Sequence, residues 1–172
     1  QSTPLLGSNF KPFLYAAALS EGFVASTIIN DAPIVFEDEF LEEKWRPRNA
    51  SGRFFGPTRL REGLVQSRNL VSIRLLRELG IDKARDFSEH FGFKKEALQP
   101  DLSLALGTAS LSPLDNAAAY SIFTNGGKKV VPYFIEKIID RSGKIIFEKP
   151  EEEQEEVIDP RVAYIIKDIL QE

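Results

Sequence analysis

One stretch near the N-terminus most constrains the fold of this chain, because it combines an apolar helix face with two reactive side chains. The apolar residues follow the three- and four-residue spacing of one helix face: Phe10, Phe13, Leu14, Ala17 and Ala18. This spacing predicts a core-facing helix from about Ser8 to Ser20, with Pro12 tolerated near its first turn and Gly22 as its end. The fold therefore has to bury this face.

Ser8 and Lys11 begin the same stretch. Three residues apart on a helix, they leave one face a turn apart, which places an amine beside a hydroxyl. A serine becomes a good nucleophile when an adjacent base takes its proton, and burial lowers the pKa of a lysine enough for it to serve. The pair predicts a nucleophile and its base. Because Ser-x-x-Lys is a common pattern, an ordinary amphipathic helix with Lys11 in solvent is the alternative.

Composition excludes several other chemistries. Without cysteine the chain has no thiol nucleophile, cysteine-bound zinc or disulfide, and the single His90 sits in a segment typical of a helix end. A histidine metal site or a Ser-His-Asp triad is therefore not expected, and we predict no metal. A net charge of −4 without a large basic patch argues against nucleic acid as a partner. No apolar run approaches the length of a membrane-spanning helix.

Five later helices are predicted from apolar periodicity and from their start and stop residues. They begin near Leu60, Val71, Asp82, Pro113 and Pro160. The helix after Pro113 is apolar on most sides, which predicts that it is buried. The helix after Pro160 is expected to turn four residues inward: Val162, Ile165, Ile166 and Ile169.

The segments between the helices are predicted as short strands, turns and solvated loops. Residues 28–36 favour loops and short strands, and residues 130–140 and 145–147 favour a hairpin around a turn at 141–144. Two acidic segments, 37–43 and 150–156, are expected in solvent, the second as a flexible segment. Trp45 fits a position over the core or in a cleft equally well.

A second polar motif, Ser67-Arg68-Asn69, lies where one predicted helix ends and the next begins. Side chains at such a junction can project from a rigid scaffold toward a site. Serine and asparagine are also typical capping residues, so a capping turn is the alternative for this tripeptide.

Taken together, these motifs resemble a known family. Ser8-x-x-Lys11 followed by Ser67-x-Asn69 resembles the first two active-site motifs of the penicillin-binding protein and serine β-lactamase superfamily. Six spaced segments across nearly the whole chain are similar to the transpeptidase domain of class A, bifunctional penicillin-binding proteins of Gram-negative bacteria. They are GSNFKPF (7–13), INDAP (29–33), WRPRN (45–49), GPTRLR (56–61), SRN (67–69), and LGT (106–108) through SPL (112–114) to NGG (125–127).

The resemblance implies a role for each motif residue. Ser8 would attack the penultimate D-alanine of a peptidoglycan stem peptide, and Lys11 would take its proton. Ser67 would pass a proton to the leaving nitrogen, and Asn69 would hold the amide side of the substrate. The backbone N–H of Ser8 would be one oxyanion donor. Stem peptides ending in D-Ala-D-Ala and β-lactam antibiotics would be the partners, without a cofactor.

The resemblance also implies an α/β fold of the penicillin-binding protein and serine β-lactamase type, in which a helical subdomain meets a central antiparallel sheet. The third superfamily motif, Lys-Thr/Ser-Gly, occurs nowhere in the chain. Residues 1–172 are therefore interpreted as the N-terminal portion of the transpeptidase domain, with the sheet incomplete at the C-terminus. A glycosyltransferase domain and a membrane anchor upstream would place the site at the periplasmic face of the inner membrane.

Two other functions stay open on the same fold. A D,D-carboxypeptidase or β-lactamase would use the same chemistry with water as the acceptor, and sustained penicillin turnover would identify it. A non-catalytic penicillin-binding or interaction domain would bind drug or substrate without cross-linking. The missing third motif gives this second alternative some weight for the chain by itself.

Overall fold

The structure is a computed structural model that describes residues 7–35, 45–108, 111–151 and 153–172. Its elements in chain order are η1 (Gly7–Phe10), α1 (Lys11–Ser20), β1 (Ile28–Asp31), β2 (Gly56–Arg59), α2 (Leu60–Val65), α3 (Asn69–Leu79), α4 (Ile81–Glu89), η2 (Lys95–Ala97), η3 (Leu102–Leu106), α5 (Pro113–Thr124), β3 (Lys137–Ile139), β4 (Ile145–Glu148) and α6 (Pro160–Ile169). The predicted acidic segment 37–43 lies outside the described residues.

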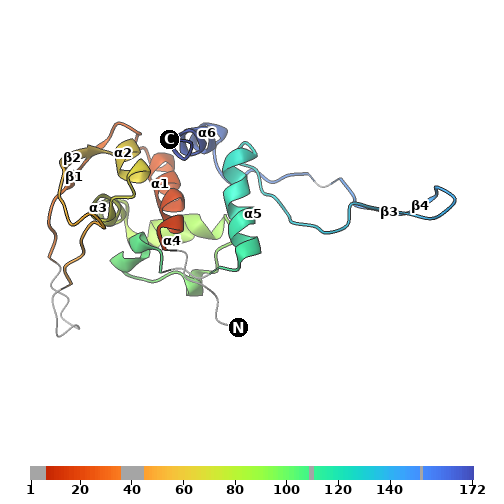
Figure 1. Cartoon of the computed structure of the whole chain (residues 1–172), viewed down its shortest axis with the longest axis horizontal. Helices are drawn as coiled ribbons and strands as arrows, with labels where there is room; N and C mark the ends of the chain where they lie inside the picture. Colours follow the sequence, from red (N-terminus) through yellow and green to blue (C-terminus); the bar gives the residue numbers. More distant parts are fainter. Residues whose placement is uncertain (1–6, 36–44, 109–110, 152) are drawn as a thin grey trace.

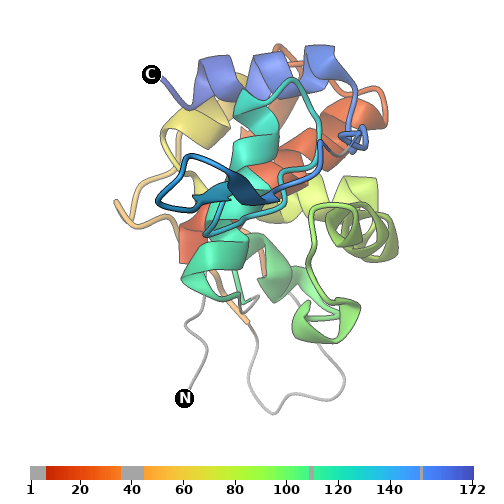
Figure 2. The ribbon, with the colours of Figure 1, turned by 90° about the vertical axis from the view of Figure 1, so that its right-hand side faces the viewer.

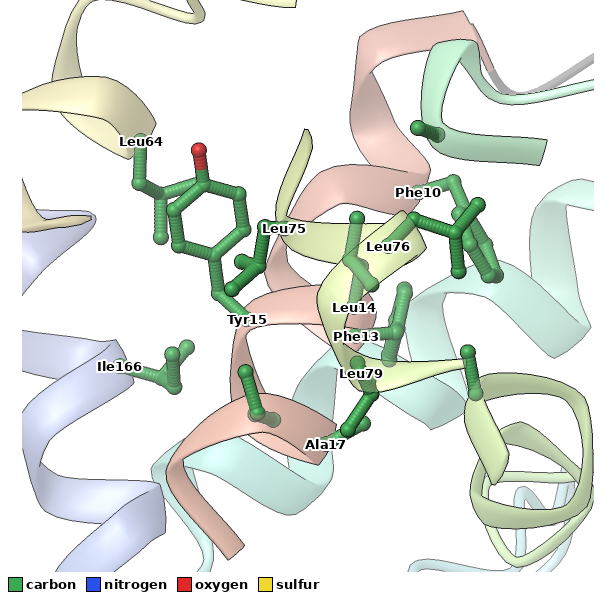
Figure 3. Packing of buried hydrophobic residues seen from close by; sticks show 14 of the residues in the cluster. Phe10, Phe13, Leu14, Tyr15, Ala17, Leu64, Leu75, Leu76, Leu79 and Ile166 are labelled. Carbon is green, nitrogen blue, oxygen red and sulfur yellow. The ribbon is translucent and has the colours of Figure 1, made fainter. Parts of the chain in front are cut away.

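Helix α1 is the centre of the packing. It contacts α2, α3, α4 and α6, which surround it in Figure 1. Every residue of α1 from Lys11 to Ala18 is buried, because helices cover it on several sides. Figure 3 shows its side chains against Leu75, Leu76 and Leu79 of α3, with Leu64 and Ile166 closing the core. The predicted core-facing helix is confirmed, although it starts at Lys11 and a 3₁₀ turn precedes it.

Aromatic rings pack around the first turn of α1. The Phe13 ring lies 4.9 Å from Phe93, 5.1 Å from Phe91 and 5.4 Å from Phe123, measured between centroids. Phe10 meets Phe93 edge to face at 5.5 Å. Such tilted and edge-to-face pairs add to the stabilisation from burial alone, so the turn just before α1 rests on a rigid base.

Strands β1 and β2 form a two-stranded antiparallel sheet, in which Ile29 pairs with Thr58 and Asn30 with Pro57. Alternation along β1 turns Ile29 and Asp31 inward. Sequence reasoning missed β2, because glycine and proline are unusual in strands. In a two-stranded sheet each strand has one unpaired edge, so the missing N–H of Pro57 is tolerated there.

The predicted hairpin is confirmed as β3 and β4, which pair antiparallel around a turn at residues 140–144. Its first strand is shorter than predicted. The hairpin projects away from the helices in Figure 1 and comes toward the viewer in Figure 2. All residues of both strands are exposed.

The predicted burial of the helix after Pro113 is wrong. In α5 only Ala119, Ile122 and Phe123 are buried, and the side chain of Leu114 is 49% exposed. One face of α5 packs on α6 and on the aromatic cluster, whereas the remaining residues of the helix are exposed or half-buried. The apolar composition of α5 predicted its burial, but composition does not show how many faces of a helix pack against other elements.

Helix α6 begins as predicted, with the Asp159 carboxylate capping it through the N–H of Arg161 at 2.8 Å. Val162, Ile166 and Ile169 are buried, and Ile165 is half-buried against the same core.

Trp45 packs on the edge of the core, which is the first of the two positions predicted for it. Within the described residues the strands form only the two antiparallel pairs β1–β2 and β3–β4, and the larger central sheet stays an expectation.

Candidate active site

Ser8 lies on η1, a 3₁₀ turn that leads directly into α1, and its side chain is exposed. The turn is fixed at both ends by contacts from distant parts of the chain. The N–H of Gly7 donates to the carbonyl oxygen of Gly107 at 2.9 Å, and the Tyr120 hydroxyl donates to the carbonyl oxygen of Asn9 at 2.5 Å. Ser8 therefore stands between two anchored neighbours.

The contact between Gly7 and Gly107 leaves no room for a side chain. A Cβ added to Gly107 would lie 1.6 Å from the Gly7 carbonyl oxygen, and the φ angle of Gly107 is +81°, a conformation that glycine adopts easily. Gly107 ends η3, which packs on α3. The position of Ser8 thus depends on backbone-to-backbone contact with η3.

Lys11 begins α1 with its side chain inside the protein, where only 1% of the residue is exposed. Its Nζ donates to the Ser67 carbonyl oxygen at 2.8 Å, to Ser67 Oγ at 3.0 Å and to Asn69 Oδ1 at 2.7 Å. Burial lowers the pKa of the Lys11 amine to about 8, since the charged form loses hydration. An appreciable share of the amine is then neutral near neutral pH, and the solvated Lys11 of the alternative interpretation is excluded.

Ser67 and Asn69 lie at the junction between α2 and α3, as predicted. Ser67 has a φ of +51°, a strained conformation for a residue other than glycine. The residue that caps α3 is Arg68, and its side chain makes no capping hydrogen bond. Instead, both Ser67 and Asn69 face the Lys11 amine, so capping does not explain the motif.

A buried polar cluster, formed by Asp31, Asn49 and Arg68, supports this junction. The Asp31 carboxylate is fully buried and accepts from the Asn49 side-chain amide at 2.8 and 3.0 Å. Asn49 Oδ1 accepts from the N–H of Leu70 at 3.2 Å, which satisfies a free N–H in the first turn of α3. Asp31 Oδ2 also lies 4.0 Å from an Arg68 guanidinium nitrogen.

The structure thus brings together Lys11, Ser67 and Asn69, three of the four predicted site residues. The Ser8 hydroxyl is not among the hydrogen-bond acceptors of Lys11 in the described part of the chain. Catalytic hydrogen bonds are often long in a free enzyme and tighten when substrate binds. The arrangement offers an exposed hydroxyl, a buried amine that can be neutral, and a second hydroxyl within proton-transfer distance of that amine.

Sequence reasoning missed the supporting residues Asp31, Asn49, Gly107 and Tyr120. A signal existed for Asp31, because the alternation of β1 places a carboxylate at an inward position beside Ile29. No local pattern links Gly107 to Gly7, since the contact joins positions 100 residues apart.

Other site types find little support in the described residues. His90 caps the end of α4 and is exposed, as its sequence context predicted. No three histidine, cysteine, aspartate or glutamate side chains in the ranges given above gather closely enough to hold a metal ion. In the same ranges, no helix combines the length and apolar character needed to cross a bilayer.

Comparison with known sequences identifies the family. The family model "Penicillin binding protein transpeptidase domain" matches residues 3–172. Penicillin-binding protein 1A of Pseudomonas aeruginosa is 52% identical over 142 residues, and that of Neisseria meningitidis serogroup A is 43% identical over 171 residues. These alignments cover 83% and 96% of this chain but only 17% and 21% of the relatives, so the chain spans about a fifth of their length.

Comparison with solved structures supports the fold. The crystal structure of penicillin-binding protein 1A from Haemophilus influenzae superposes with a TM-score of 0.92 at 36% identity, covering 99% of this chain and 30% of that one. Penicillin-binding protein A from Mycobacterium tuberculosis, as an imipenem acyl-enzyme complex, shares the fold with a TM-score of 0.83 at 23% identity, over 97% of this chain and 43% of that one. By sequence and by fold, this chain belongs to the transpeptidase family of penicillin-binding proteins.

Proposed function

We propose that this chain carries the acylation half of a peptidoglycan D,D-transpeptidase active site, with Ser8 as nucleophile. The observation that carries the proposal is the buried Lys11 amine, held 3.0 Å from Ser67 Oγ and 2.7 Å from Asn69 Oδ1 at the start of the helix that follows Ser8. Family membership supports the reaction class.

In the acylation step, Ser8 Oγ attacks the carbonyl carbon of the penultimate D-alanine while the neutral Lys11 amine takes its proton. The Ser8 N–H stabilises the oxyanion of the tetrahedral intermediate. When the peptide bond breaks, the proton passes from Lys11 through Ser67 Oγ to the nitrogen of the departing D-alanine. The short distance between the amine and Ser67 Oγ supports this relay.

The acyl group then passes from Ser8 to the acceptor. The amine of a neighbouring stem peptide attacks the ester carbon, forms the cross-linking amide and returns the proton to Ser8. Asn69 orients the amide side of the donor. A β-lactam enters the same first step, but its ring opens without losing a leaving group, so the ester on Ser8 persists.

We place the active protein at the periplasmic face of the inner membrane, where peptidoglycan is made, with its anchor and a glycosyltransferase domain outside this chain. The relatives named penicillin-binding protein 1A support this placement.

The test uses the full-length protein that carries this sequence, with a stem pentapeptide as donor and an excess of an amine acceptor. We expect an amide product from the wild type and none from Ser8→Ala. The exposed hairpin residue Ser142 supplies the control variant Ser142→Ala, which should match the wild type. Hydrolysis without amide formation would identify the carboxypeptidase or β-lactamase alternative. Substrate binding without either product would identify the non-catalytic one.

A further inference from the structure

The middle residue of the Ser67-Arg68-Asn69 motif points the opposite way from its neighbours. Ser67 and Asn69 reach the Lys11 amine, whereas the side chain of Arg68 is only 10% exposed and lies among α2, β2 and the buried Asp31. A buried guanidinium is costly unless it is paired and hydrogen-bonded. Its partners therefore reveal what the residue does.

The guanidinium group of Arg68 joins β2, α2 and the Phe55 ring just before β2. One terminal nitrogen donates to Thr58 Oγ1 of β2 at 2.9 Å, and the other donates to Glu62 Oε1 of α2 at 2.6 Å. The group also stacks on the Phe55 ring, with its central carbon 4.0 Å from the ring centroid. Only arginine offers a flat, rigid fork that can make these contacts together.

The main chain of Arg68 is fixed as well. Its N–H donates to the Gly63 carbonyl oxygen at 2.9 Å, and its carbonyl oxygen accepts from Ser72 Oγ at 3.1 Å. Ser72 Oγ in turn lies 3.1 Å from the hydroxyl of Tyr15, a buried residue one turn beyond Lys11 on α1. Helix α1, which carries the Lys11 amine, is thereby linked to Arg68, the residue between Ser67 and Asn69.

These contacts explain how Ser67 keeps its strained backbone. A non-glycine residue at positive φ persists where its surroundings determine its conformation. The strained φ of +51° directs both the carbonyl oxygen and Oγ of Ser67 to the Lys11 amine. We propose that Arg68 is a positioning residue whose buried guanidinium holds Ser67 and Asn69 against Lys11, so that Ser8 can be acylated. This inference rests on the proposed function.

The test measures the second-order rate of acylation by a fluorescent penicillin in the full-length protein. Arg68→Lys keeps the charge but loses the fork and the stacking, and we expect a 10- to 100-fold slower acylation. Because Arg68 acts through its neighbours, the same substitution placed in a Ser67→Ala, Asn69→Ala background should slow the remaining acylation less than about threefold. A purely structural role would give the same loss in both backgrounds.

Arg85→Lys is a matched control on α4. Arg85 also has a mostly buried guanidinium, donates to a carbonyl oxygen, that of Lys95, at 3.0 Å, and shares with Arg68 a buried Nε that has no partner in the described part of the chain. It belongs to none of the elements around Ser67. We expect its acylation rate to stay within about twofold of the wild type.

A second variant covers the case in which Arg68→Lys does not fold. Phe55→Leu removes only the stacked ring of a half-exposed residue. We expect this variant to slow acylation two- to fivefold, and we expect this slowing to be absent in the Ser67→Ala, Asn69→Ala background. If Arg68→Lys and Phe55→Leu both acylate at the wild-type rate, or if their losses are the same in both backgrounds, the positioning role is wrong. If the wild type itself forms no adduct, the proposed function fails instead.

Discussion

The two sides of the candidate site are held in place by different physical means. The Ser8 turn rests on backbone contact with Gly107, a hydrogen bond from Tyr120 and the aromatic rings beneath Phe10. The Ser67–Asn69 junction rests instead on buried charged and polar groups, among them Asp31 and Arg68. Lys11 lies between the two sides and belongs to both.

This difference fits what each side has to provide. A nucleophile needs a fixed backbone, because both its hydroxyl and its N–H act on one carbonyl group, and close backbone packing supplies that. The junction has to hold a strained serine and aim two polar side chains at an amine, which requires directional hydrogen bonds. The Ser8 side should therefore be sensitive to added volume, and the junction to lost hydrogen bonds.

The largest effect is expected where the two sides meet. Lys11→Met should slow acylation of Ser8 by about a thousandfold, within the range for loss of a general base. The free energy of unfolding of Lys11→Met should stay close to that of the wild type, because the substitution also removes the cost of burying an amine. Acylation rates and thermal unfolding of the two proteins check this. Loss of folding together with activity would mean that Lys11 has a mainly structural role.

Added volume on the Ser8 side should have the next largest effect. Gly107→Ala forces a Cβ into the Gly7 carbonyl group at a positive φ, so we expect about 3 kcal/mol of destabilisation and about a hundredfold slower acylation. Gly143→Ala is the matched control: its φ is +84°, but no atom lies within 4 Å of the added Cβ. It should lose about 1 kcal/mol and no activity. Equal effects in the two variants would contradict the close-contact explanation.

The pH dependence reports on the burial of Lys11. Only the neutral amine can take the Ser8 proton, and burial sets the pKa of Lys11 at about 8. The second-order rate of acylation should therefore fall about tenfold for each unit of pH below 8 and level off above it. Stopped-flow acylation between pH 6 and pH 9.5 measures this. A rate that does not change between pH 6 and pH 8 would contradict a base with this pKa.

The smallest effect concerns the single hydrogen bond from Tyr120. Tyr120→Phe keeps the ring that packs edge to face on Phe13 and removes only the donor to the Asn9 carbonyl oxygen. We expect about threefold slower acylation and about 1 kcal/mol of lost stability, the usual size for one hydrogen bond. Full activity with unchanged stability would show that the Tyr120 hydrogen bond does not anchor the Ser8 turn.

Much of the fold could be predicted because its signals are local. The start of α5 at Pro113, the start of α6 at Pro160 and the hairpin around residues 141–144 all follow from capping and turn residues. The burial of α5 could not be predicted, because it depends on which of its faces have neighbours. Strand β2 was missed since its glycine and proline are acceptable only in a strand with a free edge.

The motifs of the site could be recognised, but not the contacts that support them. Lys11 and Ser67 stood out by residue type and spacing. Their hydrogen bond joins residues 56 positions apart, and only the packing of α1 against α3 brings them together. The role of Gly107 depends on an equally distant backbone contact, for which a single sequence holds no local signal.

Whether Ser8 is the nucleophile of a site built around Lys11, Ser67 and Asn69 can be decided with benzylpenicillin. The full-length protein is incubated with the drug, its intact mass is measured and the modified peptide is mapped. We expect one stable adduct whose mass equals that of the drug, located on Ser8 and absent from Ser8→Ala. An adduct on another residue, persistent labelling of Ser8→Ala or no adduct at all would contradict the assignment of Ser8 as the nucleophile.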